Sequence, residues 1–136
     1  MPTMPYLHFR GDCANALAFY AEVFGGANLQ MMRYADGPDA PPAWSGSDRI
    51  MHGQVTIGDG TLMASDFPPG APGEAQAAVS VMQSAPDVAT AGRWFTALAK
   101  DGAVIQPFGP TFFSSGFGMV KDRFGTHWII AAGPAS

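Results

Sequence analysis

Two segments of the chain share one pattern of hydrophobic and polar residues, about 75 positions apart. In residues 6–10, polar and apolar side chains alternate, which is typical of a β-strand with one buried face. After a Gly-Asp break, apolar residues follow at helical spacing: Ala16, Phe19, Tyr20, Val23 and Phe24. Gly25 and Gly26 favour the end of this helix, because glycine tolerates the left-handed backbone found there. Residues 6–26 therefore predict a strand, a tight turn and an amphipathic helix.

The same helical offsets recur downstream, at Ala91, Trp94, Phe95, Leu98 and Ala99. Self-similarity over most of a chain indicates a tandem repeat, although the pattern leaves open a coincidence of two amphipathic helices. In both helices the apolar stripe is expected to pack on a sheet. We therefore predict that Phe19, Phe24, Trp94 and Leu98 are buried.

In each copy of the repeat, one predicted strand precedes the helix and three predicted strands follow it. The first copy has predicted strands at residues 28–34, 50–57 and 61–66, and the second at residues 77–82, 103–106, 118–121 and 126–131. Asp87 is expected to cap the second helix. Residues 35–48 are rich in proline and glycine and predict a loop without regular structure, in which Trp44 needs a surface to cover. Both copies thus read as βαβββ, joined by a linker at residues 67–73.

Composition limits the classes of protein to consider. The chain has 136 residues, 47% of them hydrophobic and 13% charged, which predicts one globular domain over residues 1–136. The net charge is −4 and the seven basic residues are scattered, so no nucleic acid is expected as a partner. Cys13 alone cannot form an internal disulfide, and no signal peptide or membrane-spanning apolar run is visible. We therefore expect a cytoplasmic protein without a membrane partner.

Four segments carry a resemblance to a known family: YLHFRG, ANALAFYAEVFGG, MHGQVTIGDGTLMASD and GFGMVKDRFGTHW. Together they resemble the PhnB-like branch of the vicinal oxygen chelate superfamily, the relatives of glyoxalase and bleomycin-resistance proteins. The resemblance implies an α+β fold of two tandem βαβββ modules, at residues 3–66 and 73–132, forming a half-open barrel. It also implies a homodimer, which exposed-looking apolar segments at residues 112–117 and around Trp44 favour as well.

The superfamily implies a test for a metal cofactor. Its enzymes chelate a divalent metal with His and Glu side chains inside the barrel. Aligning the modules gives four ligand positions, occupied by Tyr6 or His8, a residue near Met63, Gln76 and Ile129. This set does not bind a catalytic metal, so no metal cofactor is expected. An alternative is zinc held by three histidines: His8, His52 and His127.

Strand parity predicts which side chains line a ligand cleft. If Leu7 and Phe9 pack under the helices, then residues of the opposite parity face the concave side. The candidate ligand-binding residues are Tyr6, His8, Trp44, His52, Gln54, Met63, Gln76, Ser80, Phe113 and His127. The cleft would hold a small, partly aromatic molecule, with Trp44 as a lid from its own chain or its partner's and with Trp128 as a further stacking surface.

Several of these residues also have ordinary structural interpretations. The histidines fit hydrogen-bonded strand residues, and Phe108, Phe112, Phe113 and Phe117 fit a core or a subunit contact as well as a pocket wall. Asp66 is a candidate general base or the cap of the linker turn. Cys13, at a helix N-terminus that lowers thiol pKa, fits a small buried residue. The alternative function is a metal-dependent lyase, isomerase or dioxygenase.

Overall fold

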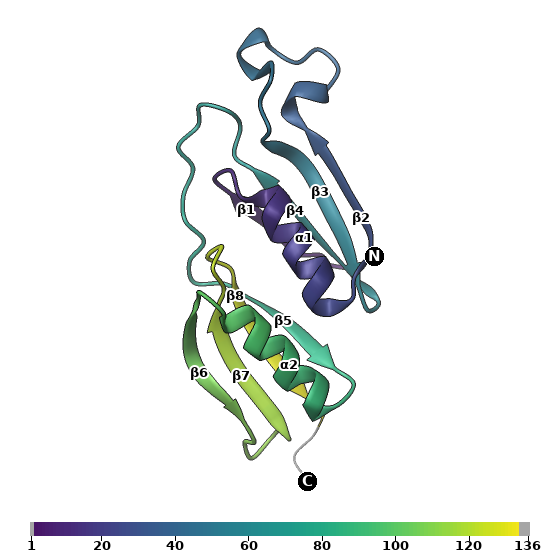
Figure 1. Ribbon diagram of the computed structural model, residues 1–136, viewed down its shortest axis with the longest axis vertical. Coiled ribbons are helices and arrows are strands. Elements are labelled where there is room, and N and C mark those ends of the chain that lie inside the picture. The colour runs from purple at the N-terminus through teal and green to yellow at the C-terminus, as the bar shows by residue number, and fades with distance from the viewer. Residues whose placement is uncertain (1, 134–136) are drawn as a thin grey trace. The chain divides into compact units, whose positions relative to one another are not determined.

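The computed structural model describes residues 2–133, and the chain divides into two compact units, residues 1–75 and 76–136. Unit 1 contains β1 (Tyr6–Phe9), α1 (Cys13–Phe24), β2 (Ala27–Arg33), β3 (Ile50–Ile57) and β4 (Gly60–Asp66). Unit 2 contains β5 (Ser80–Ala85), α2 (Val88–Ala99), β6 (Ala103–Gly109), β7 (Gly116–Lys121) and β8 (His127–Ala132). Each unit has one helix on one face of its own sheet (Figure 1). The predicted α+β class and the tandem βαβββ order are confirmed, and the barrel stays a prediction.

The two sheets have the same topology. Their strand orders are β1-β4-β3-β2 and β5-β8-β7-β6, with the β1–β4 and β5–β8 pairs parallel and the others antiparallel. Tyr6 is paired with Met63 in the first parallel pair, and Ser80 is paired with His127 in the second. Each of these residue pairs stands at the first position of its parallel ladder.

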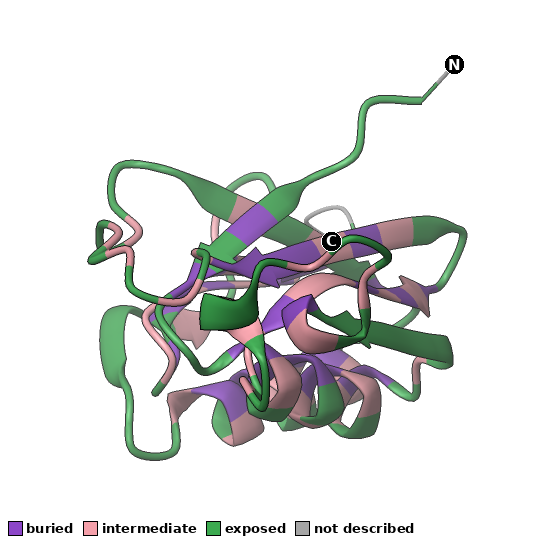
Figure 2. Ribbon diagram, turned by 90° about the horizontal axis from the view of Figure 1, so that it is seen from above, coloured by how far each residue is buried: buried purple, intermediate pink, exposed green. Residues whose placement is uncertain are grey.

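The core of each unit lies where its helix meets its sheet (Figure 2). In unit 1 the sheet contributes Leu7, Phe9, Val55 and Leu62, and α1 contributes Leu17 and Tyr20 among its buried residues. Gly53 lies directly under the helix, because a Cβ atom there would be 2.5 Å from Leu17 Cδ1. The absence of a side chain at this position lets α1 approach β3 closely.

The repeat is visible in the helices themselves. Both have 12 residues and they begin 75 positions apart, at Cys13 and Val88. Helix α1 ends at Gly25 in the left-handed conformation, as the glycine pair predicted. Asp87 is the N-cap of helix α2, and its Oδ1 accepts a 2.7 Å hydrogen bond from the Thr90 amide. That bond is also the main reason that the pKa of Asp87 is lowered.

The N-terminus of α1 is capped from a distance. Asp12 occupies the N-cap position but makes no side-chain cap bond. Instead Oδ1 of the buried Asp66 accepts hydrogen bonds from the amides of Gly11 (2.8 Å) and Cys13 (3.0 Å), and Oδ2 accepts one from Ile50 (2.8 Å). Asp66 therefore joins the turn after β1, the start of α1 and the start of β3. These bonds cap the start of α1, whereas the sequence predicted a cap of the linker turn or a general base.

Several details of the sequence-based prediction were wrong. Phe24 and Leu98 are buried as expected, but Phe19 and Trp94 are only half-buried, because the helices turn Tyr20 and Phe95 toward the sheets. Residues 35–48 are not wholly irregular, since short 3-10 turns lie at Tyr34–Asp36 and Pro42–Trp44. Strand β5 begins at Ser80, where its pairing with β8 starts, and not at residue 77.

Candidate functional site

The face of the unit 1 sheet that α1 does not cover carries polar and aromatic side chains. On β1, Leu7 and Phe9 are buried toward the helix, so Tyr6 and His8 point the opposite way. The same alternation in β3 and β4 puts His52, Gln54, Met63 and Ser65 on that opposite face. We call this surface the helix-free face of unit 1. The prediction of strand parity from the sequence thus agrees with the structure for the five predicted residues on these strands.

A chain of hydrogen bonds connects three of these residues. Tyr6 Oη lies 2.9 Å from His52 Nδ1, and His52 Nε2 lies 3.1 Å from Gln54 Oε1. Because an amide oxygen can only accept, His52 Nε2 donates to Gln54, and in the Nε2–H tautomer Nδ1 accepts the Tyr6 O–H. Gln54 thereby sets the direction of both hydrogen bonds.

Aromatic rings surround this chain. The Tyr6 ring lies 5.3 Å from the His8 ring and 5.6 Å from the His52 ring, and His8 stacks on Phe67 at 5.4 Å. His8 Nδ1 is 3.2 Å from Ser65 Oγ. Tyr6 is 41% exposed, so its ring and hydroxyl are accessible from solvent. The helix-free face therefore combines accessible π surfaces with oriented polar atoms.

Phe67 and Ser65 are residues of this surface that the sequence reasoning did not include. Arg49 donates hydrogen bonds to the carbonyls of Phe67 (2.9 Å) and Arg10 (3.3 Å), which fixes the start of the linker beside β1. Ser65 could have been found from its parity with Met63. Phe67 carried no such signal, because it follows the last strand residue and its ring position depends on the Arg49 contacts.

Unit 2 has an equivalent face with fewer polar groups. Ser80 and His127 are paired across β5 and β8, and His127 Nδ1 is buried without a hydrogen-bond partner among residues 2–133. Gln76 lies before β5, and its amide donates a 3.0 Å hydrogen bond to Thr126 Oγ1. Of these two predicted residues, Ser80 therefore lies on a strand and Gln76 lies in the segment before it.

The predicted stacking residues behave differently from one another. Trp128 is buried on the helix side of β8, and its indole N–H donates a 2.9 Å hydrogen bond to Asp122 Oδ2, so its expected role as a ligand-stacking surface was wrong. Trp44 packs edge-on against Tyr34, with ring centroids 4.9 Å apart, and is half-buried. Phe113 is 50% exposed and contacts the rings of Phe112 and Phe117.

Cys13 is not a reactive thiol in this structure. It is fully buried, and burial, together with the nearby Asp66 carboxylate, raises the pKa of its thiol to about 12. The expected lowering by the helix N-terminus is therefore wrong, while the interpretation as a small buried residue is confirmed. A thiol with such a pKa stays protonated at neutral pH and is a poor nucleophile.

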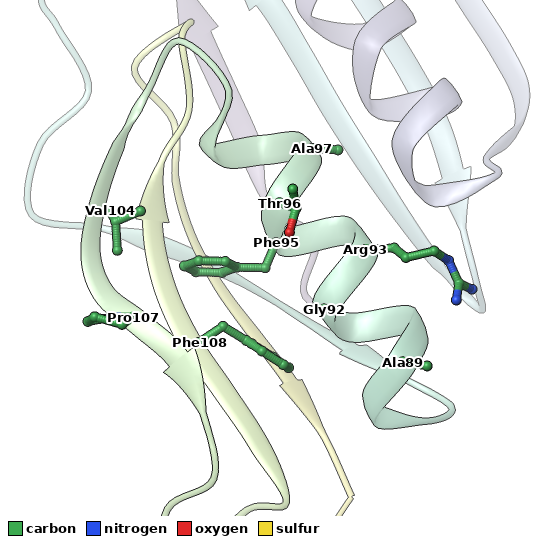
Figure 3. Close-up of a pocket in the computed structure, with 9 residues that line it drawn as sticks. All are labelled: Ala89, Gly92, Arg93, Phe95, Thr96, Ala97, Val104, Pro107 and Phe108. Carbon is green, nitrogen blue, oxygen red and sulfur yellow. The ribbon is translucent and has the colours of Figure 1, made fainter.

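A separate groove lies on the helix-bearing side of the unit 2 sheet, between α2 and β6 (Figure 3). Its volume is about 810 Å³ and most of its walls are apolar, with Phe95 and Phe108 rings 5.6 Å apart at its base. Figure 3 shows Arg93 pointing away from these rings. The groove contains Phe108 from the predicted aromatic set but none of the predicted site residues.

No group of three or more His, Cys, Asp or Glu side chains that could hold a metal ion is present among the residues that the structure describes. On the helix-free face of unit 1 the aligned ligand positions are occupied by Tyr6 or His8 and by Met63. His8 and His52 are each engaged with a neighbouring side chain, Ser65 and Tyr6 respectively. The zinc alternative, which needs His127 as a third ligand, stays a prediction.

Comparison with known proteins defines the family. A family model described as the Glyoxalase/Bleomycin resistance protein/Dioxygenase superfamily matches residues 5–130. The chain therefore belongs to this superfamily, as its sequence motifs predicted. Protein YjdN of Escherichia coli (strain K12) is 32% identical over 139 residues, covering 96% of this chain and 94% of YjdN.

Solved structures agree with this assignment. Protein PA1353 from Pseudomonas aeruginosa is 37% identical, with a TM-score of 0.88 over 98% of each chain. A Bacillus cereus PhnB protein, described as a putative 3-demethylubiquinone-9 3-methyltransferase, has a TM-score of 0.74 over 97% of this chain and 99% of its own, at 22% identity. The latter comparison supports the fold alone. Within residues 2–133, no helix has the length and apolar character needed to cross a membrane.

Proposed function

We propose that this protein binds a small, partly aromatic molecule on the helix-free face of unit 1, without a catalytic metal. The observation that carries the proposal is the Tyr6–His52–Gln54 chain of hydrogen bonds set among the rings of His8 and Phe67. Solvent-facing sheet residues do not need such mutual orientation. A ligand site does, because oriented polar atoms on mostly apolar walls give a small molecule both affinity and a fixed pose.

The ligand would stack on the Tyr6 and His8 rings and contact the Met63 side chain. Ser80 and His127, which are paired within the unit 2 sheet, stay sequence-based predictions as ligand contacts. Trp44 stays a candidate lid, although its packing on Tyr34 ties it to its own unit.

The experiment is a thermal-shift and calorimetric screen of small aromatic compounds on the wild-type protein and the His52→Ala variant. Losing the His52 hydrogen bonds should weaken binding by at least about 1 kcal/mol, with little change in the folding of the unliganded protein. Gln83→Ala is a suitable control, because Gln83 lies on the helix side of β5 and bonds only the neighbouring Ser84 carbonyl in the contacts described. Equal binding by wild type and His52→Ala would contradict the proposal.

Absence of a metal is part of the proposal and needs its own measurement. Elemental analysis of protein purified without added metal should find well under one equivalent of zinc, iron, nickel or manganese per chain. One equivalent would favour the alternative, a metal-dependent lyase, isomerase or dioxygenase.

A homodimer in the cytoplasm completes the proposal. Phe112 is 93% exposed and Phe113 is 50% exposed, and two neighbouring aromatic rings in water favour a covering partner. Light scattering at micromolar concentration should give twice the chain mass. A monomeric mass with ligand binding intact would rule the dimer out.

A further inference from the structure

The direction of the Tyr6–His52–Gln54 hydrogen bonds specifies what the ligand must offer. Gln54 Oε1 can only accept, so its 3.1 Å contact with His52 Nε2 selects the Nε2–H tautomer, and in that tautomer Nδ1 accepts the Tyr6 O–H at 2.9 Å. The single hydroxyl proton of Tyr6 is thereby used inside the protein. What Tyr6 Oη presents to solvent is a lone pair.

An exposed lone pair selects hydrogen-bond donors. A ligand hydroxyl can donate to Tyr6 Oη without breaking any bond of the chain. A ligand that can only accept, such as an ether or a ketone, meets the lone pair of another acceptor. To be bound equally well it would have to take the Tyr6 proton away from His52, which leaves Nδ1 without its donor.

The surroundings select an aromatic donor. The rings of His8 and His52 lie 5.3 Å and 5.6 Å from the Tyr6 ring, and Met63 is the residue paired with Tyr6 on β4. An aromatic ligand stacked on these rings can bring a hydroxyl on its edge against Tyr6 Oη. We infer that the ligand class of this site is a phenol, bound by donation of its hydroxyl proton to Tyr6 Oη.

This inference rests on the proposed function, and matched probes separate the two. The probes are 4-methylphenol and 4-methylanisole, which differ only in that a methyl group replaces the donated proton, and 4-methylacetophenone as an acceptor. For the wild-type protein, calorimetry or ligand-observed NMR should show the phenol binding at least about fivefold tighter than the anisole or the ketone.

Two variants test the origin of that preference. Tyr6→Phe removes the acceptor and should bring the phenol-to-anisole ratio to about one by weakening phenol binding. Gln54→Met keeps the Tyr6 hydroxyl but releases His52 to adopt either tautomer, so Tyr6 can donate and the ketone should gain affinity relative to the phenol. A merely structural role for Gln54 would weaken all three probes together. Thermal unfolding of each variant checks that it is folded.

Each outcome decides a different claim. Phenol preference in the wild type that is lost in both variants supports the inference. Equal binding of phenol, anisole and ketone by the wild type overturns the inference while leaving the proposed aromatic site in place. Unchanged preference in Tyr6→Phe also overturns it. Failure of every aromatic probe to bind overturns the proposed function as well.

Discussion

The Asp66 carboxylate should be among the largest single side-chain contributions to the stability of unit 1. It is 1% exposed and accepts three backbone hydrogen bonds, from Gly11 and Cys13 through Oδ1 and from Ile50 through Oδ2. In Asp66→Asn the amide keeps one acceptor oxygen. An NH₂ group must therefore face at least one of the three amides, most simply that of Ile50, and two donors then oppose each other.

The magnitude follows from the bonds lost. A hydrogen bond to a charged acceptor contributes about 1.5–3 kcal/mol, and a buried amide left unsatisfied costs about 1–3 kcal/mol. Removing the negative charge beside the N-terminus of α1 adds about 0.3–1 kcal/mol. These contributions overlap, and we expect Asp66→Asn to lower the free energy of unfolding by about 2–4 kcal/mol.

Urea unfolding combined with amide hydrogen exchange checks this prediction. Exchange protection should fall at Ile50 in Asp66→Asn more than at Thr90, whose amide bonds Asp87 in unit 2. Asp12→Asn is the matched control, because Asp12 makes no cap bond, and it should stay within about 0.5 kcal/mol of the wild type. If Asp66→Asn also changed the free energy of unfolding by no more than about 0.5 kcal/mol, the conclusion that Asp66, and not Asp12, caps the start of α1 would be refuted.

Two further predictions follow from buried positions in unit 1. The pKa of the Cys13 thiol is raised from 9.0 to about 12 in the folded chain. Between these values the thiol stays protonated in the folded chain but ionises in the unfolded chain. Its contribution to stability is therefore complete below about pH 9 and is lost as the pH rises toward 12. Over that range the wild-type free energy of unfolding should fall relative to Cys13→Ala by about 1.4 kcal/mol per pH unit, and parallel pH profiles would contradict the assignment. Gly53→Ala would put a Cβ atom 2.5 Å from Leu17 Cδ1 and should cost about 1–3 kcal/mol by chemical denaturation. Gly109→Ala is its control, since nothing lies within 4 Å of a Cβ atom there, and equal effects of the two changes would count against the close packing of α1 on β3.

The elements and the strand faces were predictable because both depend on short-range patterns. The alternation in residues 6–10 and 50–57 was sufficient to put Tyr6, His8, His52 and Gln54 on one face of a sheet. The 75-residue offset of the helices was visible in their apolar spacing.

Contacts between distant segments were not predictable in the same way. Asp66 bonds amides more than 50 positions earlier in the chain, and nothing in its own neighbourhood indicates them. The ring of Phe67 reaches His8 because Arg49 holds the carbonyl of Phe67. Trp128 is a different case: it follows His127 on β8 and so has the opposite parity, which already indicated the helix side, where its indole N–H bonds Asp122.

The central claim is that a small aromatic molecule binds the helix-free face of unit 1, and methyl NMR of the eight methionines tests it most directly. Met63 lies on that face beside Tyr6, while Met51 has the opposite parity on β3 and contacts the loop near Gly37. Titration with 4-methylphenol should shift the Met63 methyl resonance in a saturable way and leave that of Met51 unchanged, and the shift should weaken in His52→Ala. Saturable shifts that leave Met63 unchanged, or a Met63 shift that is the same in His52→Ala, would contradict the account.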